Sequence, residues 1–221
     1  MTKEKINFEK CDKAFIENAF QIKRVELMPE LESWLNTSVE IEPVINENLD
    51  FLKNLYKDRM DDVNEETLKM NFIAPVLNMV QFNGKNFSAF ADEKLEAEFD
   101  DFILTGKADW FVAKGKYKPE RPYLFLQEYS GTPPERPKRG NSDPDGQLLA
   151  EMLVVRQLNK QPNETLHGVV ITGKFWSFVV LKNDEYSISP SYDSTQQADL
   201  LSIYQVLKVA KGFVEAKILA S

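Results

Sequence analysis

Residues 106–130, GKADWFVAKGKYKPERPYLFLQEYS, constrain the fold more than any other stretch of the chain. Two runs rich in aromatic and β-branched residues, 108–113 and 123–129, predict two strands joined by a polar loop that contains proline. Each run carries one acid, Asp109 early in the first strand and Glu128 late in the second. If the strands pair antiparallel, these two carboxylates lie side by side.

Two like charges at the edge of a core are costly unless something binds them. A divalent cation with oxygen ligands is one solution. A solvated face that keeps both acids in water is the other. Asp109 and Glu128 alone leave both readings open.

Composition narrows the classes of function. The chain has 221 residues and a formal net charge of −8, which argues against a general nucleic-acid coat but not against a local basic patch. Cys11 and His167 are the only cysteine and histidine, so an intrachain disulfide and a Cys- or His-rich metal site are excluded. A Cys11–His167 catalytic pair has no supporting motif. No signal-like or membrane-spanning run is present, so we expect a cytoplasmic protein with no membrane partner.

The first 60 residues predict helices and carry no chemical motif. Apolar residues recur at helical spacing over 8–37, and again from Val44 to about Arg59. We therefore expect an all-helical N-terminal extension, 1–60, that offers a surface for a protein partner. Residues 61–221 would form the second part of the chain.

The second part alternates helices and strands. A helix begins near Asp62, where Glu65 three residues later resembles a capping box, and Pro75 should kink or shorten it. Another helix starts at Asp143 and carries Gln147 in its first turn. With further strands and a long final helix, this order predicts an α/β (α+β) fold with a mixed central sheet flanked by helices.

A loop rich in proline and glycine follows the second strand, over residues 131–146. It holds the densest basic cluster of the chain, Arg136, Lys138 and Arg139. Because the loop leaves directly from the strand of Glu128, it would overhang any site there. Binding of substrate phosphate and a solvated loop are both open.

Four segments in this order resemble the PD-(D/E)XK nuclease superfamily, and more narrowly the N-terminal nuclease domain of type I restriction enzyme R subunits. They are Glu65 in EETLKMNFIAPVL, Asp109 in GKADWFV, Glu128 in LFLQEYS and Gln147 in DPDGQLLAEML. The resemblance covers about residues 60–215. It implies a restriction-endonuclease-like fold and a DNA-cleaving activity of the kind used in bacterial defence.

The resemblance also implies roles for these residues. Asp109 and Glu128 would bind Mg²⁺ or Mn²⁺, Glu65 would add a ligand or orient a water, and Gln147 would line the site. The metal would stabilise charge that develops on the scissile phosphate.

The chain departs from the family at the motif lysine, whose position is occupied by Ser130. Serine has no positive charge and is a poor base, and the loss of such a group costs about 10²–10⁴-fold in rate. Lys107 lies two residues before Asp109, on the same face of its strand, and is one candidate replacement. Lys138 from the loop is the other.

Three hypotheses follow. The first is a metal-dependent DNA endonuclease, with phosphodiester hydrolysis impaired by the loss of the lysine. The second is a catalytically inactive binding module that keeps the nuclease fold. The third is a structural protein whose acids are simply solvated.

Overall fold

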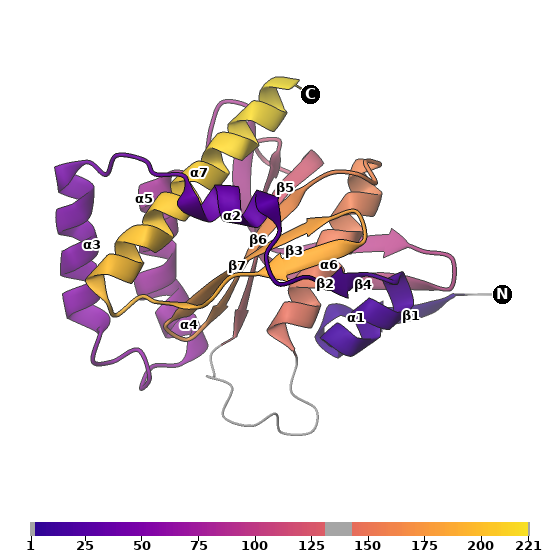
Figure 1. The fold of residues 1–221 in the computed structure, drawn as a ribbon, viewed down its shortest axis with the longest axis horizontal. Coiled ribbons are helices and arrows are strands. Elements are labelled where there is room, and N and C mark those ends of the chain that lie inside the picture. The colour runs from indigo at the N-terminus through magenta and orange to yellow at the C-terminus, as the bar shows by residue number, and fades with distance from the viewer. Residues whose placement is uncertain (1–2, 131–142, 221) are drawn as a thin grey trace.

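Figure 1 shows the fold in a computed structural model that describes residues 3–130 and 143–220. The strands form one mixed sheet in the order β1-β4-β5-β6-β7-β8-β2, with β3 beside β4 and β9 beside β7. Their bounds are β1 Glu4–Asn7, β2 Lys23–Arg24, β3 Phe87–Glu98, β4 Phe102–Lys114, β5 Glu120–Ser130, β6 Leu166–Thr172, β7 Phe175–Lys182, β8 Glu185–Ile188 and β9 Tyr192–Asp193. The prediction of a mixed sheet flanked by helices is confirmed.

Helices cover both faces of this sheet. Figure 1 places α3, α5 and α7 on one side and α1 and α6 on the other. The helices are α1 Lys13–Phe20, α2 Pro29–Asn36, α3 Pro43–Tyr56, α4 Glu65–Leu68, α5 Ala74–Val80, α6 Pro144–Asn159 and α7 Gln197–Ala220. A 3-10 turn, η1 Phe8–Lys10, precedes α1, and a π-helical turn, η2 Lys69–Ile73, joins α4 to α5.

Alternating side chains of the strands divide the core into two clusters. Phe125 and Val112 face the cluster that includes Trp34 of α2, whereas Leu126 and Phe111 face the cluster built on α6. Helix α6 is buried over ten consecutive residues, Gly146 to Val155, so it lies between the sheet and the N-terminal segment.

The expectation of an all-helical segment 1–60 is wrong. Strand β1 pairs parallel with β4, and β2 pairs parallel with β8. Both strands are short and polar, so they have no apolar alternation to reveal them, and they form because the sheet edges present unpaired backbone groups. A Cβ on Gly146 would lie 2.5 Å from the carbonyl oxygen of Cys11, so glycine allows η1 to pack directly on α6. The division at residue 60 stays a prediction.

Other boundaries refine the expectations. The helix predicted to begin near Asp62 is α4, which begins at Glu65. Its N-cap is Asn64, whose Oδ1 accepts a hydrogen bond from the Thr67 N–H at 2.9 Å. The predicted cap at Asp62 is therefore wrong. The predicted break at Pro75 is confirmed, because η2 ends at Ile73 and α5 continues with proline in its first turn.

The N-terminal segment also exposes apolar side chains. On α3, Phe51 is 68% exposed, and Val44 and Leu55 are about half exposed. A protein partner for this segment stays a prediction. In the part of the chain that the structure describes, no helix is long and apolar enough to span a membrane.

Candidate functional site

The site is built on the pairing of β4 with β5. These strands pair antiparallel, with Trp110 opposite Gln127. Asp109 precedes Trp110 and Glu128 follows Gln127, so the two acids lie directly beyond the last pair of this ladder. The predicted antiparallel arrangement of the two strands is therefore confirmed.

The sheet opens at these acids. Along one edge of β4, pairing with β1 ends at Thr105, and pairing with β5 begins at Trp110. In this gap the Tyr129 N–H donates to Asp109 Oδ2 at 3.0 Å, so a carboxylate replaces the strand partner. Because the strands separate here, groups from both faces of the sheet can approach the acids.

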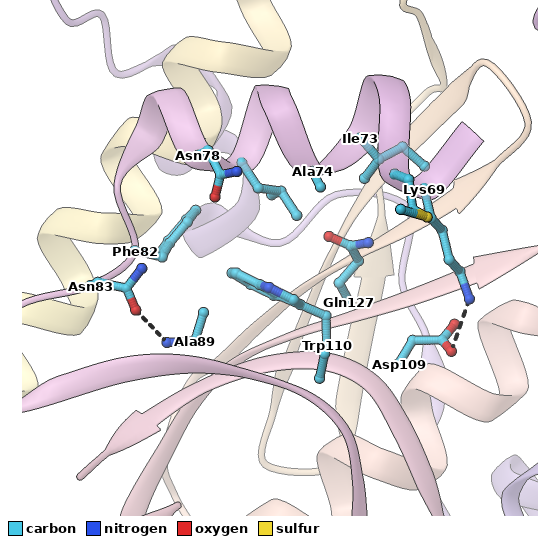
Figure 2. Close-up of a pocket in the computed structure, with 13 residues that line it drawn as sticks. Lys69, Ile73, Ala74, Asn78, Phe82, Asn83, Ala89, Asp109, Trp110 and Gln127 are labelled. Atoms are coloured by element: carbon cyan, nitrogen blue, oxygen red, sulfur yellow. Dashed lines mark hydrogen bonds and ion pairs between the residues drawn. The ribbon is translucent and has the colours of Figure 1, made fainter. Parts of the chain in front are cut away.

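Lys69 reaches the gap from the side of α4 and η2. Its Nζ lies 2.9 Å from Glu65 Oε1 and 3.2 Å from Asp109 Oδ1, and it sits 5.0 Å from the centre of the Tyr129 ring. Figure 2 shows the Lys69–Asp109 pair beneath the helix. Sequence reasoning placed Lys69 on the face of Glu65 but gave it no role, because the family pattern puts its lysine on the strand of Glu128.

The local charges alter both partners of this ion pair. Burial lowers the pKa of Lys69, but the ion pairs with Glu65 and Asp109 outweigh burial and leave that pKa above its ordinary value. The pKa of Asp109 is also raised, because burial of the carboxyl outweighs the attraction of Lys69. Burial thus disfavours the charge of Asp109, and the ammonium of Lys69 opposes that effect.

Glu151 was missed by sequence reasoning and faces Glu128 from α6. It is fully buried, and neither of its carboxyl oxygens has a hydrogen-bond donor among the described residues. Burial and the charge of Glu128 raise the pKa of Glu151 well above its ordinary range. Burial and the charge of Asp109 likewise raise the pKa of Glu128. Each of these two buried carboxyls therefore disfavours the charged form of the other.

Gln147 lies one helical turn before Glu151 on α6. The spacing of four residues places both side chains on one face of the helix. Gln147 is 7% exposed. Its expected place at the site and its function stay predictions.

Of the two candidates to replace the motif lysine, only Lys107 lies among the described residues, and it pairs with Asp92 rather than with Asp109 or Glu128. Lys107 is exposed and binds both oxygens of Asp92 at 2.8 and 2.9 Å. Asp92 has a φ of 57°, a local bend of β3 that brings its carboxylate to Lys107. Ser130 ends β5 opposite Thr172, and its carbonyl accepts the Gly173 N–H at 3.0 Å.

The predicted phosphate-binding residues Arg136, Lys138 and Arg139 lie outside the described residues. Cys11 and His167 belong to opposite faces of the sheet, so they form no catalytic pair. Burial raises the pKa of the Cys11 thiol to about 12 and lowers the pKa of His167 to about 3. His167 packs edge-on against Trp34, with ring centres 4.9 Å apart, which is a structural role.

The acid cluster, defined as Glu65 and Asp109 with their partner Lys69, together with Glu128 and Glu151, suits Mg²⁺ in its donor chemistry but not in its spacing. Carboxylate oxygens are the ligands that Mg²⁺ prefers, and the unpartnered oxygens of Glu151 would gain from a cation. Among residues 3–130 and 143–220, however, no three His, Cys, Asp or Glu side chains converge as a metal site. The Lys69 ammonium lies between Glu65 and Asp109, so a metal there requires this lysine to shift.

Comparisons with known proteins do not assign this chain to a family. No protein-family model matches the chain, and no curated protein is significantly similar to it. The chemistry of the acid cluster therefore rests on the residues and their geometry.

Proposed function

We propose that this chain is a nuclease-like protein of the PD-(D/E)XK type that acts on DNA phosphodiesters at the acid cluster. The observation that carries the proposal is that Lys69 pairs with both Glu65 and Asp109 where β4 and β5 separate, beside the strand that carries Glu128. The helix with Glu65 and the helix with Gln147 both flank this point. The restriction-endonuclease-like fold and the Mg²⁺ or Mn²⁺ ion belong to the same proposal.

Lys69 supplies the cation that Ser130 lacks. A nuclease lysine orients the attacking water and offsets charge on the phosphate. Lys69 is held at the cluster by Glu65 and Asp109 rather than by the strand of Glu128. In the proposed reaction Lys69 orients the water, and Glu128 with Glu151 holds a proton that a bound metal would displace. Asp109 and Glu128 are the proposed metal ligands.

A cleavage assay with plasmid and single-stranded DNA, in Mg²⁺ or Mn²⁺, tests this proposal. We expect cleavage by the wild type, and its loss on Asp109→Asn and in EDTA. Lys107→Met is the matched control, because its ammonium is bound to both oxygens of Asp92 and forms no ion pair with Asp109 or Glu128 among the described residues. Cleavage by Ser130→Lys under conditions where the wild type is inert would identify a degenerate nuclease.

The second candidate is a catalytically inactive nuclease-fold module. One observation favours it: Lys69 already occupies the position between Glu65 and Asp109 that a cation would take. This candidate predicts no calorimetric Mg²⁺ binding and DNA binding that survives EDTA. Mg²⁺-dependent cleavage would rule it out.

A further inference from the structure

A cavity of about 210 Å³ adjoins the acid cluster on the side of α5. Its walls are η2 and α5 above, and β3, β4 and β5 below, as Figure 2 shows. Lys69 and Asp109 form one end of it, so a ligand in the cavity would be next to the proposed reaction centre. We call it the Trp110 cavity.

The walls of the Trp110 cavity are flat and apolar. Trp110 lies along the floor, with Phe82 edge-on to it at a ring-centre distance of 5.3 Å. The space remains open because alanines face it from both walls, Ala74 on α5 and Ala89 and Ala91 on β3. An aromatic floor flanked by small residues of β3 and faced by Ala74 is a shape that suits a planar ring.

The cavity also contains an unsatisfied hydrogen-bonding group. Gln127 is 3% exposed, and its Oε1 has no hydrogen-bond partner among the described residues. Figure 2 shows its amide directed between Trp110 and the helix. A buried acceptor without a partner costs about 1–3 kcal/mol, so a ligand with a donor at its edge would be favoured. At the far end, Asn83 accepts the Ala89 N–H at 3.1 Å, which fixes its carbonyl inward to the strand and leaves its amide N–H groups to donate.

The volume of the Trp110 cavity and its position next to Lys69 limit the class of ligand that it can bind. The volume is below the roughly 300–1,000 Å³ of pockets for drug-sized ligands, so it suits one ring system. A planar ring with donors and acceptors at its edge, attached to a phosphate that reaches Lys69, is a nucleotide. We propose that the Trp110 cavity takes one unpaired nucleobase of the DNA strand whose phosphate lies at the acid cluster; this rests on the proposed function and adds its substrate form.

A base in this cavity cannot remain paired, because helix and sheet close over it. We therefore expect the protein to prefer single-stranded DNA, or a base turned out of the duplex. Stacking on an aromatic residue contributes about 5- to 100-fold in affinity per base. A strand that lacks this base should therefore bind more weakly by the same factor.

The experiment uses the full chain and a single-stranded 12-mer with one central 2-aminopurine, compared with the same strand carrying an abasic site, in EDTA and in Mg²⁺. We expect quenching of 2-aminopurine fluorescence on binding, and about 5- to 100-fold weaker binding of the abasic strand. Ala74→Leu, which fills the cavity, should abolish the quenching and remove the preference for the intact strand. Ala216→Leu, an exposed alanine of α7, is the matched control.

Ala91→Leu fills the cavity from the opposite wall and replaces Ala74→Leu if that variant fails to fold. Equal binding of intact and abasic strands, with unchanged cleavage by the filled variants, would overturn the base site and leave the nuclease proposal standing. Free 2-aminopurine nucleoside 5′-monophosphate gives the converse test. Its binding by the wild type, its loss on filling the cavity, and no cleavage of any strand would keep the base site and overturn the nuclease. No quenching with either probe overturns the base site.

Discussion

The acid cluster consists of two pairs of carboxyl groups, one partly exposed and one buried. Glu65 and Asp109 are partly exposed and share the ammonium of Lys69, whereas Glu128 and Glu151 are buried and share no cation among the described residues. The first pair is satisfied as it stands. The second pair needs a proton at neutral pH, because two ionised carboxylates cannot be buried together. The buried carboxyls lack a cationic partner, whereas the exposed ones have Lys69. A bound ligand would therefore change the free energy most at the buried pair.

The largest effect should come from Lys69, the lysine of the partly exposed pair. Lys69→Met should lower the rate of DNA cleavage by about 10²–10⁴-fold, because the water and phosphate lose their only described cation at the cluster. Single-turnover cleavage in Mg²⁺ measures it, with Lys107→Met as control. An equal effect of both variants would contradict the role of Lys69. Tighter Mg²⁺ binding by Lys69→Met with no cleavage by either protein would show that the lysine only stands in for a metal.

The buried pair should make metal binding depend on pH. Because the pKa of Glu128 is raised, Mg²⁺ must displace a proton at neutral pH, and its affinity should rise about tenfold per pH unit for each proton released. Titration calorimetry at pH 6.5 and 7.5, in two buffers of different ionisation enthalpy, gives the number of protons. An affinity independent of pH would place the metal away from Glu128.

Glu151→Gln should increase the free energy of unfolding by about 1–3 kcal/mol at pH 8. The folded-state pKa of Glu151 is raised, so the folded wild type holds protons that the unfolded chain loses near pH 4.3, and its stability falls as pH rises above that point. Below pH 4 the carboxyl is protonated in both states, and this source of difference between wild type and variant should vanish. Urea unfolding at both pH values measures this.

Glu164→Gln is the matched control for the buried glutamate. Glu164 is also buried, but its carboxylate binds Lys217 Nζ at 2.7 Å and the Asn159 amide at 2.8 Å. Loss of that ion pair should lower stability instead of raising it. The same sign for both substitutions would contradict the contrast between satisfied and unsatisfied acids.

The smallest effect belongs to the exposed pair. Glu65→Gln should lower the free energy of unfolding by no more than about 1 kcal/mol, since Glu65 is 41% exposed and its pair with Lys69 is screened by solvent. The loss should shrink at 1 M salt. Urea unfolding at low and high salt tests it, and a loss of several kcal/mol would show that the ion pair is structural.

The sequence was sufficient to predict the strands and helices at the centre of the molecule. The strands of Asp109 and Glu128 are long and rich in aromatic and β-branched residues, so local preference and tertiary packing agree on them. Their antiparallel pairing is confirmed, and it puts both acids at the same end of the β4–β5 ladder. The helix of Glu65 and the helix of Gln147 were likewise visible from their apolar periodicity.

Only the tertiary structure decided the rest. Strands β1 and β2 have no apolar pattern and exist because a sheet edge accepts their backbone groups. Glu151 reads as one polar residue in an apolar helix until the fold buries it against Glu128. Lys69 reads as a solvated lysine until the gap between β4 and β5 brings Asp109 to it. Local sequence determines which element a residue belongs to, whereas the partner of a charge is set by distances between elements that are far apart in the chain.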